Sequence, residues 1–287
     1  MNRAGRSAGK PSNAKTVSSG ASDAVTCALA GSCGIAFMAK ASTPGRAKTR
    51  LVPPLTFDEA ALLNTAFLQD VADNVLSAAR HAEPAAGIAG YAAYGPSGSE
   101  DFFHRTLPAA IGLIGAWQPN FGDCLWHTIG DILARGHSSA VVLNSDSPTL
   151  PTALLIETAA VLARPGDHAV LGPSNDGGYY LLGLKAAHRR MFEDIAWSTE
   201  RVAEQTLERA DEIGLDVHHL PVWYDVDDAD GLRRLHDELC GEDLPRRPNA
   251  HAPRYAAQTA KLIRRLWRDR DFAGRSDPVM QIDEARA

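Results

Sequence analysis

The middle of the chain is built from two alternating patterns of apolar positions. Seven short apolar runs are typical of buried strands, and they lie at residues 34–39, 88–94, 111–117, 140–143, 169–172, 179–184 and 217–222. Between them, apolar residues spaced three or four apart predict helices over residues 56–80, 125–133, 152–163, 200–213 and 232–239. Strands that alternate with helices favour an α/β fold with a mostly parallel sheet and helices on both faces.

One run in this pattern stops abruptly at a group of short polar residues. The strand at 140–143 is followed by Asn-Ser-Asp-Ser-Pro, which places Asp146 just past its carboxyl end. Ligands of open α/β sheets bind outside such strand ends, so Asp146 is a candidate metal ligand or catalytic group. The alternative is that these residues only form a turn and cap the next helix.

A loop rich in cations follows the first predicted strand. Residues 40–50 contain Lys40, Arg46, Lys48 and Arg50, together with Gly45 and no acidic residue. Such a loop can wrap a polyphosphate, because Arg binds oxygens bidentately and Gly lets the backbone approach. The loop matches neither the P-loop nor the dinucleotide-binding pattern, and a merely solvated basic loop is the alternative.

Two further groups of residues could complete such a site. Asp225 and Asp227 follow the last predicted strand, and Mg²⁺ is commonly held by one or two carboxylates plus substrate phosphates. Asp227 is the preferred metal ligand, although helix capping is the alternative for this stretch and Asp228 is the more natural cap. The Asp176-Gly177-Gly178 turn could let a ligand approach the backbone closely, or it could simply be a turn between two strands.

Composition limits the class of protein. The chain has 287 residues with 45% hydrophobic residues, and its net charge of −6 argues against nucleic acid as the main partner. Four scattered cysteines form no C-x-x-C pair, which argues against a zinc site and for a reduced, cytoplasmic protein. Residues 1–33 are expected to be a disordered extension, 34–240 the main domain, and 241–287 a basic, partly helical appendage. We expect no membrane span, since no apolar run reaches the required length.

Four motifs in order give the chain a family resemblance. They lie at residues 44–55, 145–150, 171–184 and 224–228, and together they resemble the DUF2064 family of bacterial transferases. The resemblance implies a GT-A fold, that of the nucleotide-diphospho-sugar transferases, and kinship with the phospholactate guanylyltransferases and the molybdenum-cofactor nucleotidyltransferases. One stretch departs from the family: Gln118 is followed by a segment in which Leu125 replaces the expected Gly and His127 the expected Arg.

The resemblance also assigns roles to residues. It implies that residues 44–50 hold the nucleotide phosphates, that Asp146 and Asp227 bind Mg²⁺ or Mn²⁺, and that residues 176–178 line the acceptor side. The residues expected to bind substrate are Lys40, Gly45, Arg46, Lys48, Arg50, Gln118, Asp176, Gly177 and Gly178, with Lys48 and Asp146 expected to be catalytic.

The expected reaction is Mg²⁺-dependent nucleotidyl transfer from a nucleoside triphosphate to a small phosphorylated acceptor, with release of pyrophosphate. The many cations of the loop favour this reaction, because a triphosphate carries more charge than a diphosphate. A glycosyltransferase with a nucleotide-sugar donor is the first alternative, and a non-catalytic nucleotide-binding protein is the second. The expected partners are therefore a nucleotide or nucleotide-sugar and a small-molecule acceptor, and the oligomeric state is left open.

Overall fold

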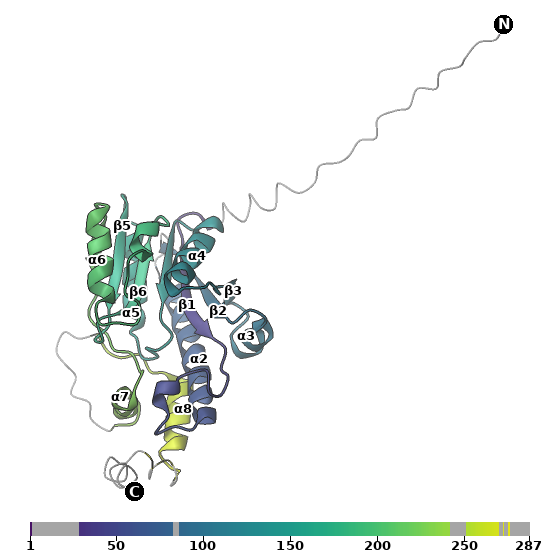
Figure 1. Cartoon of the computed structure of the whole chain (residues 1–287), viewed down its shortest axis with the longest axis vertical. Coiled ribbons are helices and arrows are strands. Elements are labelled where there is room, and N and C mark those ends of the chain that lie inside the picture. The colour runs from purple at the N-terminus through teal and green to yellow at the C-terminus, as the bar shows by residue number, and fades with distance from the viewer. Residues whose placement is uncertain (2–28, 83–85, 242–250, 270–271, 273–274, 276–287) are drawn as a thin grey trace.

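A single seven-stranded sheet organises the computed structural model (Figure 1). The structure describes Met1 and residues 29–82, 86–241, 251–269, 272 and 275. The strand order is β3-β2-β1-β4-β6-β5-β7, and β6 runs antiparallel to both of its neighbours while all other pairs are parallel. The strands are β1 (Cys33–Lys40), β2 (Ile88–Gly95), β3 (Gly112–Gly115), β4 (Ser139–Leu143), β5 (His168–Pro173), β6 (Tyr179–Leu184) and β7 (Asp216–His219). The predicted mostly parallel sheet is confirmed.

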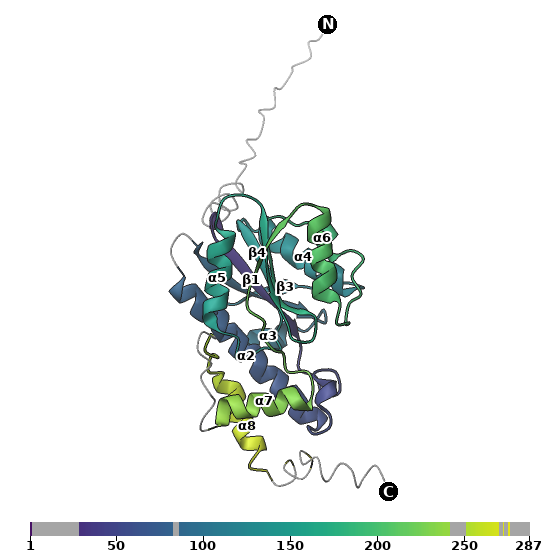
Figure 2. The same ribbon diagram turned by 90° about the vertical axis from the view of Figure 1, so that its left-hand side faces the viewer.

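Helices cover both faces of this sheet (Figure 2). One face carries α2 (Phe57–His81), α3 (Glu100–Thr106) and α5 (Thr152–Leu162), whose apolar side chains share a core with β1, β4 and β6. The opposite face carries α4 (Phe121–Ala134) and α6 (Val202–Glu212), together with the short 3-10 helix η3 (Arg189–Phe192). Both faces of the central strands are therefore buried, and the five residues of β4 are buried without exception. This burial explains their continuous apolar sequence.

The long helix α2 begins where the sequence predicts. Thr56 accepts a hydrogen bond from the Glu59 backbone N–H, and the Glu59 side chain accepts one from the Thr56 backbone N–H. This capping box satisfies two N–H groups that the first helical turn would otherwise leave unpaired. The first turns of this helix extend beyond the sheet toward α7 (Ala229–Cys240) and α8 (Ala257–Leu266) (Figure 2).

The extended part of α2 supports a third apolar cluster outside the sheet. The cluster is formed by α2, the 3-10 helix η1 (Thr49–Leu51), α7 (Ala229–Cys240) and α8 (Ala257–Leu266). Asp70 fixes α8 in place, because its two carboxylate oxygens accept the backbone N–H groups of Gln258 at 3.0 Å and Thr259 at 2.7 Å. The end of the basic loop, η1 and the segment before α7 are thereby held at one side of the sheet.

The structure differs from the sequence prediction at several element ends. The strand expected over 111–117 is only Gly112–Gly115, and the strand expected over 217–222 is Asp216–His219. Helix α3 was not predicted, because it is short and buries only Phe103. Most of the expected N-terminal extension, residues 2–28, lies outside the described residues, and the division into three regions stays a prediction. In the part of the chain that the structure describes, no helix is long and apolar enough to cross a membrane.

Candidate functional site

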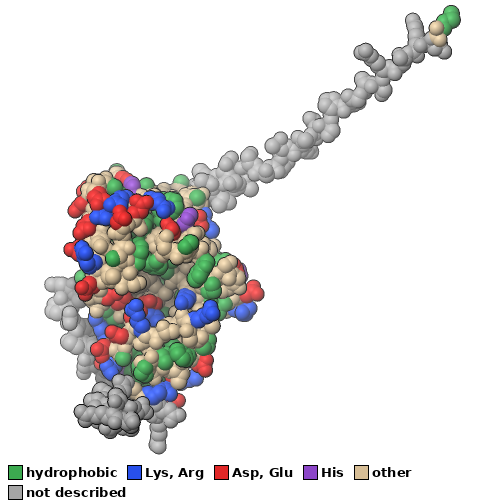
Figure 3. Space-filling model, in the orientation of Figure 1, with side chains coloured by type: hydrophobic (Ala, Val, Ile, Leu, Met, Phe, Trp, Pro, Cys, Tyr) green, Lys and Arg blue, Asp and Glu red, His purple; other side chains and the backbone are tan. Residues whose placement is uncertain are grey.

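A pocket of about 650 Å³ opens at the edge of the sheet where the parallel strands end. Lys40 at the end of β1, Gly95 at the end of β2 and Asn144 directly after β4 all line it. Because β6 runs the other way, its first residue, Tyr179, reaches the same edge. In the space-filling view the molecule is hollowed here, with acidic side chains gathered in the hollow and basic ones along its rim (Figure 3). This is the crevice in which ligands of open α/β sheets bind.

Lys48 stands between the two predicted metal ligands. Its Nζ lies 2.9 Å from Oδ1 of Asp146 and 3.2 Å from Oδ1 of Asp227, and it donates to the Val226 carbonyl over 2.7 Å. The Lys48 side chain is only 5% exposed, whereas the two carboxylates are about one-third exposed at 33% and 37%. The carboxylates therefore share one cation and still face the pocket.

The backbone at Lys48 has an unusual conformation. Its φ of 51° and ψ of 39° lie in the left-handed region, which costs free energy for a residue with a side chain. The Lys48 ion pairs and the packing of the next residues in η1 hold the backbone there. On the other side of the loop, the buried Asn64 of α2 donates to the Lys40 carbonyl and to the Ser42 hydroxyl. Specific contacts thus hold the loop near both of its ends, whereas residues 43–46 between them are exposed.

The segments that carry Asp146 and Asp227 are joined directly. The Val226 backbone N–H donates to the Asp146 carbonyl over 2.9 Å, and the Ser147 hydroxyl donates to the Tyr224 carbonyl over 2.8 Å. The buried hydroxyl of Tyr224 in turn donates to Glu238 of α7. These contacts fix the two carboxylates relative to each other.

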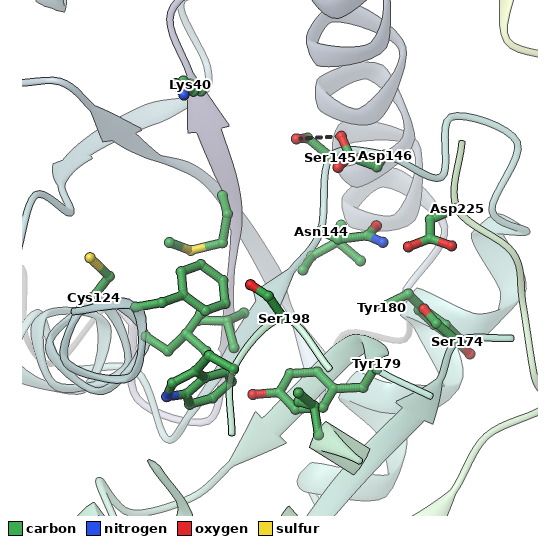
Figure 4. Close-up of a pocket in the computed structure, with 18 of the residues that line it drawn as sticks. Lys40, Cys124, Asn144, Ser145, Asp146, Ser174, Tyr179, Tyr180, Ser198 and Asp225 are labelled. Carbon is green, nitrogen blue, oxygen red and sulfur yellow. Dashed lines mark hydrogen bonds between the residues drawn. The ribbon is translucent and has the colours of Figure 1, made fainter. Parts of the chain in front are cut away.

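Asp225, the less favoured of the two aspartates predicted in this segment, also faces the pocket (Figure 4). Burial, and after it the negative charges of Asp176, Asp227 and Asp146, together raise the pKa of its carboxyl to about 6. A cluster of carboxylates that destabilise one another's charge in a cleft is a frequent property of functional sites. A bound cation would reduce the electrostatic repulsion among these carboxylates.

The predicted substrate-binding residues do not all reach the pocket. Those that line it are Lys40, Lys48, Arg50, Asp176 and Gly178, together with the two predicted metal ligands. Gly45, Arg46, Gln118 and Gly177 are absent from the lining. Arg46 is exposed. The exposed His127, one of the two departures from the family, also lies away from the pocket, whereas Leu125 lines it.

Gly177 has a different structural role. Its φ is +88°, and a Cβ at this position would lie 2.0 Å from the Glu200 carbonyl oxygen. The Gly177 carbonyl also accepts the backbone N–H of Ala203 in α6. Only glycine fits here, so the turn at 176–178 is pressed against the start of α6.

Several other pocket residues could not be predicted from the sequence pattern. Asn144, Tyr179 and Ser198 point into the pocket from three separate segments (Figure 4). Phe121 and Trp197 form an edge-to-face pair with 5.3 Å between ring centroids, and both also line it. These residues come together only through the tertiary fold, since neither spacing nor motif connects α4 with the segment before α6.

The donor set at Asp146 and Asp227 fits a divalent cation that a phosphate helps to bind. Two partly exposed carboxylates already hold one positive charge jointly, and Mg²⁺ typically takes one or two carboxylates plus substrate oxygens and water. Within the described residues, no group of three His, Cys, Asp or Glu side chains could hold a metal by itself. The protein alone therefore provides part of a coordination shell, and a ligand would have to complete it.

One solved protein, from Desulfovibrio desulfuricans G20, resembles this chain over most of its length and is described as a candidate nucleotide-diphospho-sugar transferase. The two are 26% identical, with a TM-score of 0.67 over 83% of this chain and 95% of that one. A cytidylyltransferase from Leptospira borgpetersenii serovar Hardjo-bovis is more distant, at 11% identity and a TM-score of 0.43 over 84% and 95% of the two chains. No curated protein sequence matches the chain.

Fold, pocket and structural likeness together define the class: the chain is a transferase with the GT-A fold. The family model of DUF2064, described as an uncharacterized protein conserved in bacteria, matches residues 78–199. The predicted resemblance to this family is therefore confirmed. The matched range contains the motifs at 145–150 and 171–184, whereas the basic loop and the Asp225–Asp227 segment lie outside it.

Proposed function

We propose that this protein transfers a nucleotidyl group from a nucleoside triphosphate to a small acceptor, assisted by a divalent cation. The observation that carries this proposal is the Lys48 ammonium held between Asp146 and Asp227 at the ligand-binding edge of the sheet. Carboxylates for a metal and cations for phosphates meet there in one pocket. Nucleotidyl transfer needs this combination, because its catalysis is mainly positioning and charge neutralisation.

The proposed step replaces the phosphoanhydride oxygen on the α-phosphorus with an oxygen of the acceptor. An acceptor oxygen forms a bond to the α-phosphorus of the donor, and the bond from that phosphorus to the bridging oxygen breaks. Pyrophosphate leaves with the electron pair, and the proton of a hydroxyl acceptor is released to solvent. Lys48 and Arg50 would bind the phosphates and orient them, and Lys40 lies on the same rim of the pocket.

Asp146 and Asp227 would hold the divalent cation, with Mg²⁺ expected and Mn²⁺ as the alternative. Such a cation, when bound, neutralises charge on the phosphates and orients them. The chain's own contribution is to fix both carboxylates through the backbone hydrogen bond from Val226 to Asp146.

Glycosyl transfer from a nucleotide-sugar is the second candidate. The description of the Desulfovibrio protein favours it, and so does the limited number of cations in the pocket. Three basic residues line the pocket, and Arg46 is absent from the lining. A diphosphate requires fewer cations than a triphosphate does.

Two measurements separate these reactions and test whether the protein is an enzyme. Purified protein is titrated calorimetrically with nucleoside triphosphates and nucleotide-sugars, with and without Mg²⁺, and then assayed for pyrophosphate and for nucleoside diphosphate. Pyrophosphate release supports nucleotidyl transfer, and free nucleoside diphosphate supports glycosyl transfer. Metal-dependent binding without either product would support a non-catalytic nucleotide-binding protein.

The site assignment is tested with matched variants. Asp146→Asn and Asp227→Asn should each abolish the Mg²⁺ dependence of nucleotide binding, because an amide is a much poorer ligand for this cation. Asp211→Asn, at an exposed position near the end of α6, is the control and should bind like the original protein. Unchanged Mg²⁺-dependent binding by the Asp146 and Asp227 variants would refute the assignment.

A further inference from the structure

The charges that line the pocket leave little capacity for a second anionic substrate. Five acidic residues line it, namely Asp146, Asp176, Glu200, Asp225 and Asp227, against the three basic residues Lys40, Lys48 and Arg50. Two of these cations already pair with carboxylates: Lys48 with Asp146 and Asp227, and Arg50 with Asp227 at 3.6 Å. The phosphates of a nucleotide donor would engage the remaining positive charge.

The side of the pocket away from these ion pairs is apolar and aromatic. It is formed by Tyr179 and by the edge-to-face pair of Phe121 and Trp197, with Trp117 at the mouth. The side chains of Trp117 and Phe121 are largely exposed, at 63% and 50%, although both are large and apolar. Exposed aromatic rings beside a pocket are typical of sites that bind a ring or chain of a ligand.

Two buried polar atoms on the pocket wall lack a hydrogen-bond partner. These are Oδ1 of Asn144 and the hydroxyl of Tyr179, which find none within the described part of the chain. Buried polar atoms are nearly always paired in native proteins, so unpaired ones in a pocket call for a ligand. An amide oxygen can only accept, and its natural partner is a hydroxyl or an N–H group.

Ser198 presents a third polar group to the same space (Figure 4). Its backbone has a φ of 65°, the left-handed conformation that residues with side chains rarely adopt. Hydrogen bonds on both sides hold this turn: the Thr199 hydroxyl donates to the Ala196 carbonyl, and the Ala196 N–H donates to Gln205. A strained residue that is fixed in place at a pocket suggests a functional contact.

We propose that the acceptor is uncharged and carries several hydroxyl groups, with its carbon skeleton against Phe121 and Trp197. Its hydroxyls bond to Asn144, Tyr179 and Ser198, and no phosphate on the acceptor is needed. This inference rests on the proposed nucleotidyl transfer and replaces the phosphorylated acceptor expected from the sequence. A hydroxyl oxygen of the acceptor bonds to the α-phosphorus, pyrophosphate leaves, and the hydroxyl proton goes to solvent.

The test compares acceptors in matched pairs. Glycerol is paired with glycerol 3-phosphate and glucose with glucose 1-phosphate, and each is supplied with Mg²⁺ and the triphosphate that calorimetry shows to bind. Pyrophosphate release should be at least about tenfold faster with the uncharged member of a pair. Addition of the uncharged acceptor alone should also change the tryptophan fluorescence, since Trp117 and Trp197 line its binding site.

Variants identify the residues that are responsible. Ser198→Ala should raise the KM for the uncharged acceptor about fivefold, the effect of one lost hydrogen bond, while the KM for the donor stays unchanged. Ser97→Ala, at an exposed position outside the pocket lining, is the control and should change neither constant. Glu200→Lys should shift the preference toward the phosphorylated member, because it adds a cation beside the pocket.

The possible results distinguish this inference from the proposed function. If the donor binds and the phosphorylated acceptors react faster, the uncharged acceptor is refuted and nucleotidyl transfer stands. Equal KM values for the Ser198 and Ser97 variants would also refute it. If no nucleotide binds in the presence of Mg²⁺, the proposed function itself fails, and the acceptor assignment fails with it.

Discussion

The backbone N–H of Val226 donates to the carbonyl of Asp146 over 2.9 Å and joins two segments that are far apart in the sequence. This hydrogen bond sets Asp146 and Asp227 on either side of the Lys48 ammonium. The site therefore does not depend on the position of one flexible loop. The two carboxylates come from segments that are joined by a backbone hydrogen bond, and Lys48 forms an ion pair with each of them.

Lys48 is predicted to dominate nucleotide binding among the cations of its loop. Lys48→Met keeps the length of the side chain and removes its charge, so nucleotide affinity in Mg²⁺ should fall by at least about tenfold. Arg46→Met is the matched control, because Arg46 belongs to the same loop but does not line the pocket. Calorimetric titration of both variants checks this, and equal losses would show that overall loop charge matters more than position.

Gly177 is predicted to be required for the conformation of the turn at 176–178. Gly177→Ala should lower the free energy of unfolding by about 3 kcal/mol, because its Cβ would collide with the Glu200 carbonyl and its φ is positive. Gly45→Ala has the same kind of backbone, at a φ of +73°, but open space around the added Cβ. It should cost only about 1 kcal/mol. Urea denaturation measures both, and similar losses would refute the steric explanation.

Asp70 is predicted to anchor α8 to the rest of the protein. Asp70→Ala removes the acceptor of two backbone N–H groups at the start of α8, so the free energy of unfolding should fall by about 2 kcal/mol. Amide hydrogen exchange over Ala257–Leu266 should accelerate more than exchange in the sheet. Asp73→Ala, on the same helix, is the control. A uniform acceleration across the chain would argue against a local anchor.

His137 is predicted to make stability depend on pH below neutrality. Its ring bonds the Tyr91 hydroxyl and the Ser32 hydroxyl, both at 2.7 Å, at the edge of the sheet opposite the pocket. Burial lowers the pKa of His137 in the folded state, and the charge of Arg135 lowers it further. The unfolded chain then binds a proton more readily, so stability is lost as the pH falls below about 6.5.

Melting temperatures between pH 8 and pH 5 test this dependence. The difference in stability between the original protein and His137→Gln should shrink as the pH falls, because only the original protein loses the contribution of a neutral His137. His104→Gln removes a histidine for which no comparable contact exists within the described residues and serves as the control. A constant difference across the pH range would refute the prediction.

The helices and strands that could be predicted are those whose local sequence signals and pattern of buried residues indicate the same element. Helix α2 begins at its predicted capping box, and β4 is the continuous apolar run that ends before Asp146. Helix α3 could not be predicted, because a seven-residue helix with one buried side chain has no measurable period. The edge strand β7 has no fully buried residue, so its pattern misplaced both of its ends.

The residues of the candidate site likewise divide into those that could be predicted from the sequence and those that could not. The sequence by itself determined that a basic loop and Asp146 would follow strands, because apolar runs and their polar ends are local properties. Only the tertiary structure decided that Lys48 reaches the carboxylates while Arg46 stays exposed outside the pocket lining, since a left-handed backbone at Lys48 and the packing of η1 direct the Lys48 side chain. It also brought Asn144, Tyr179 and Ser198 to one wall, because contacts between distant segments leave no period or motif in the chain.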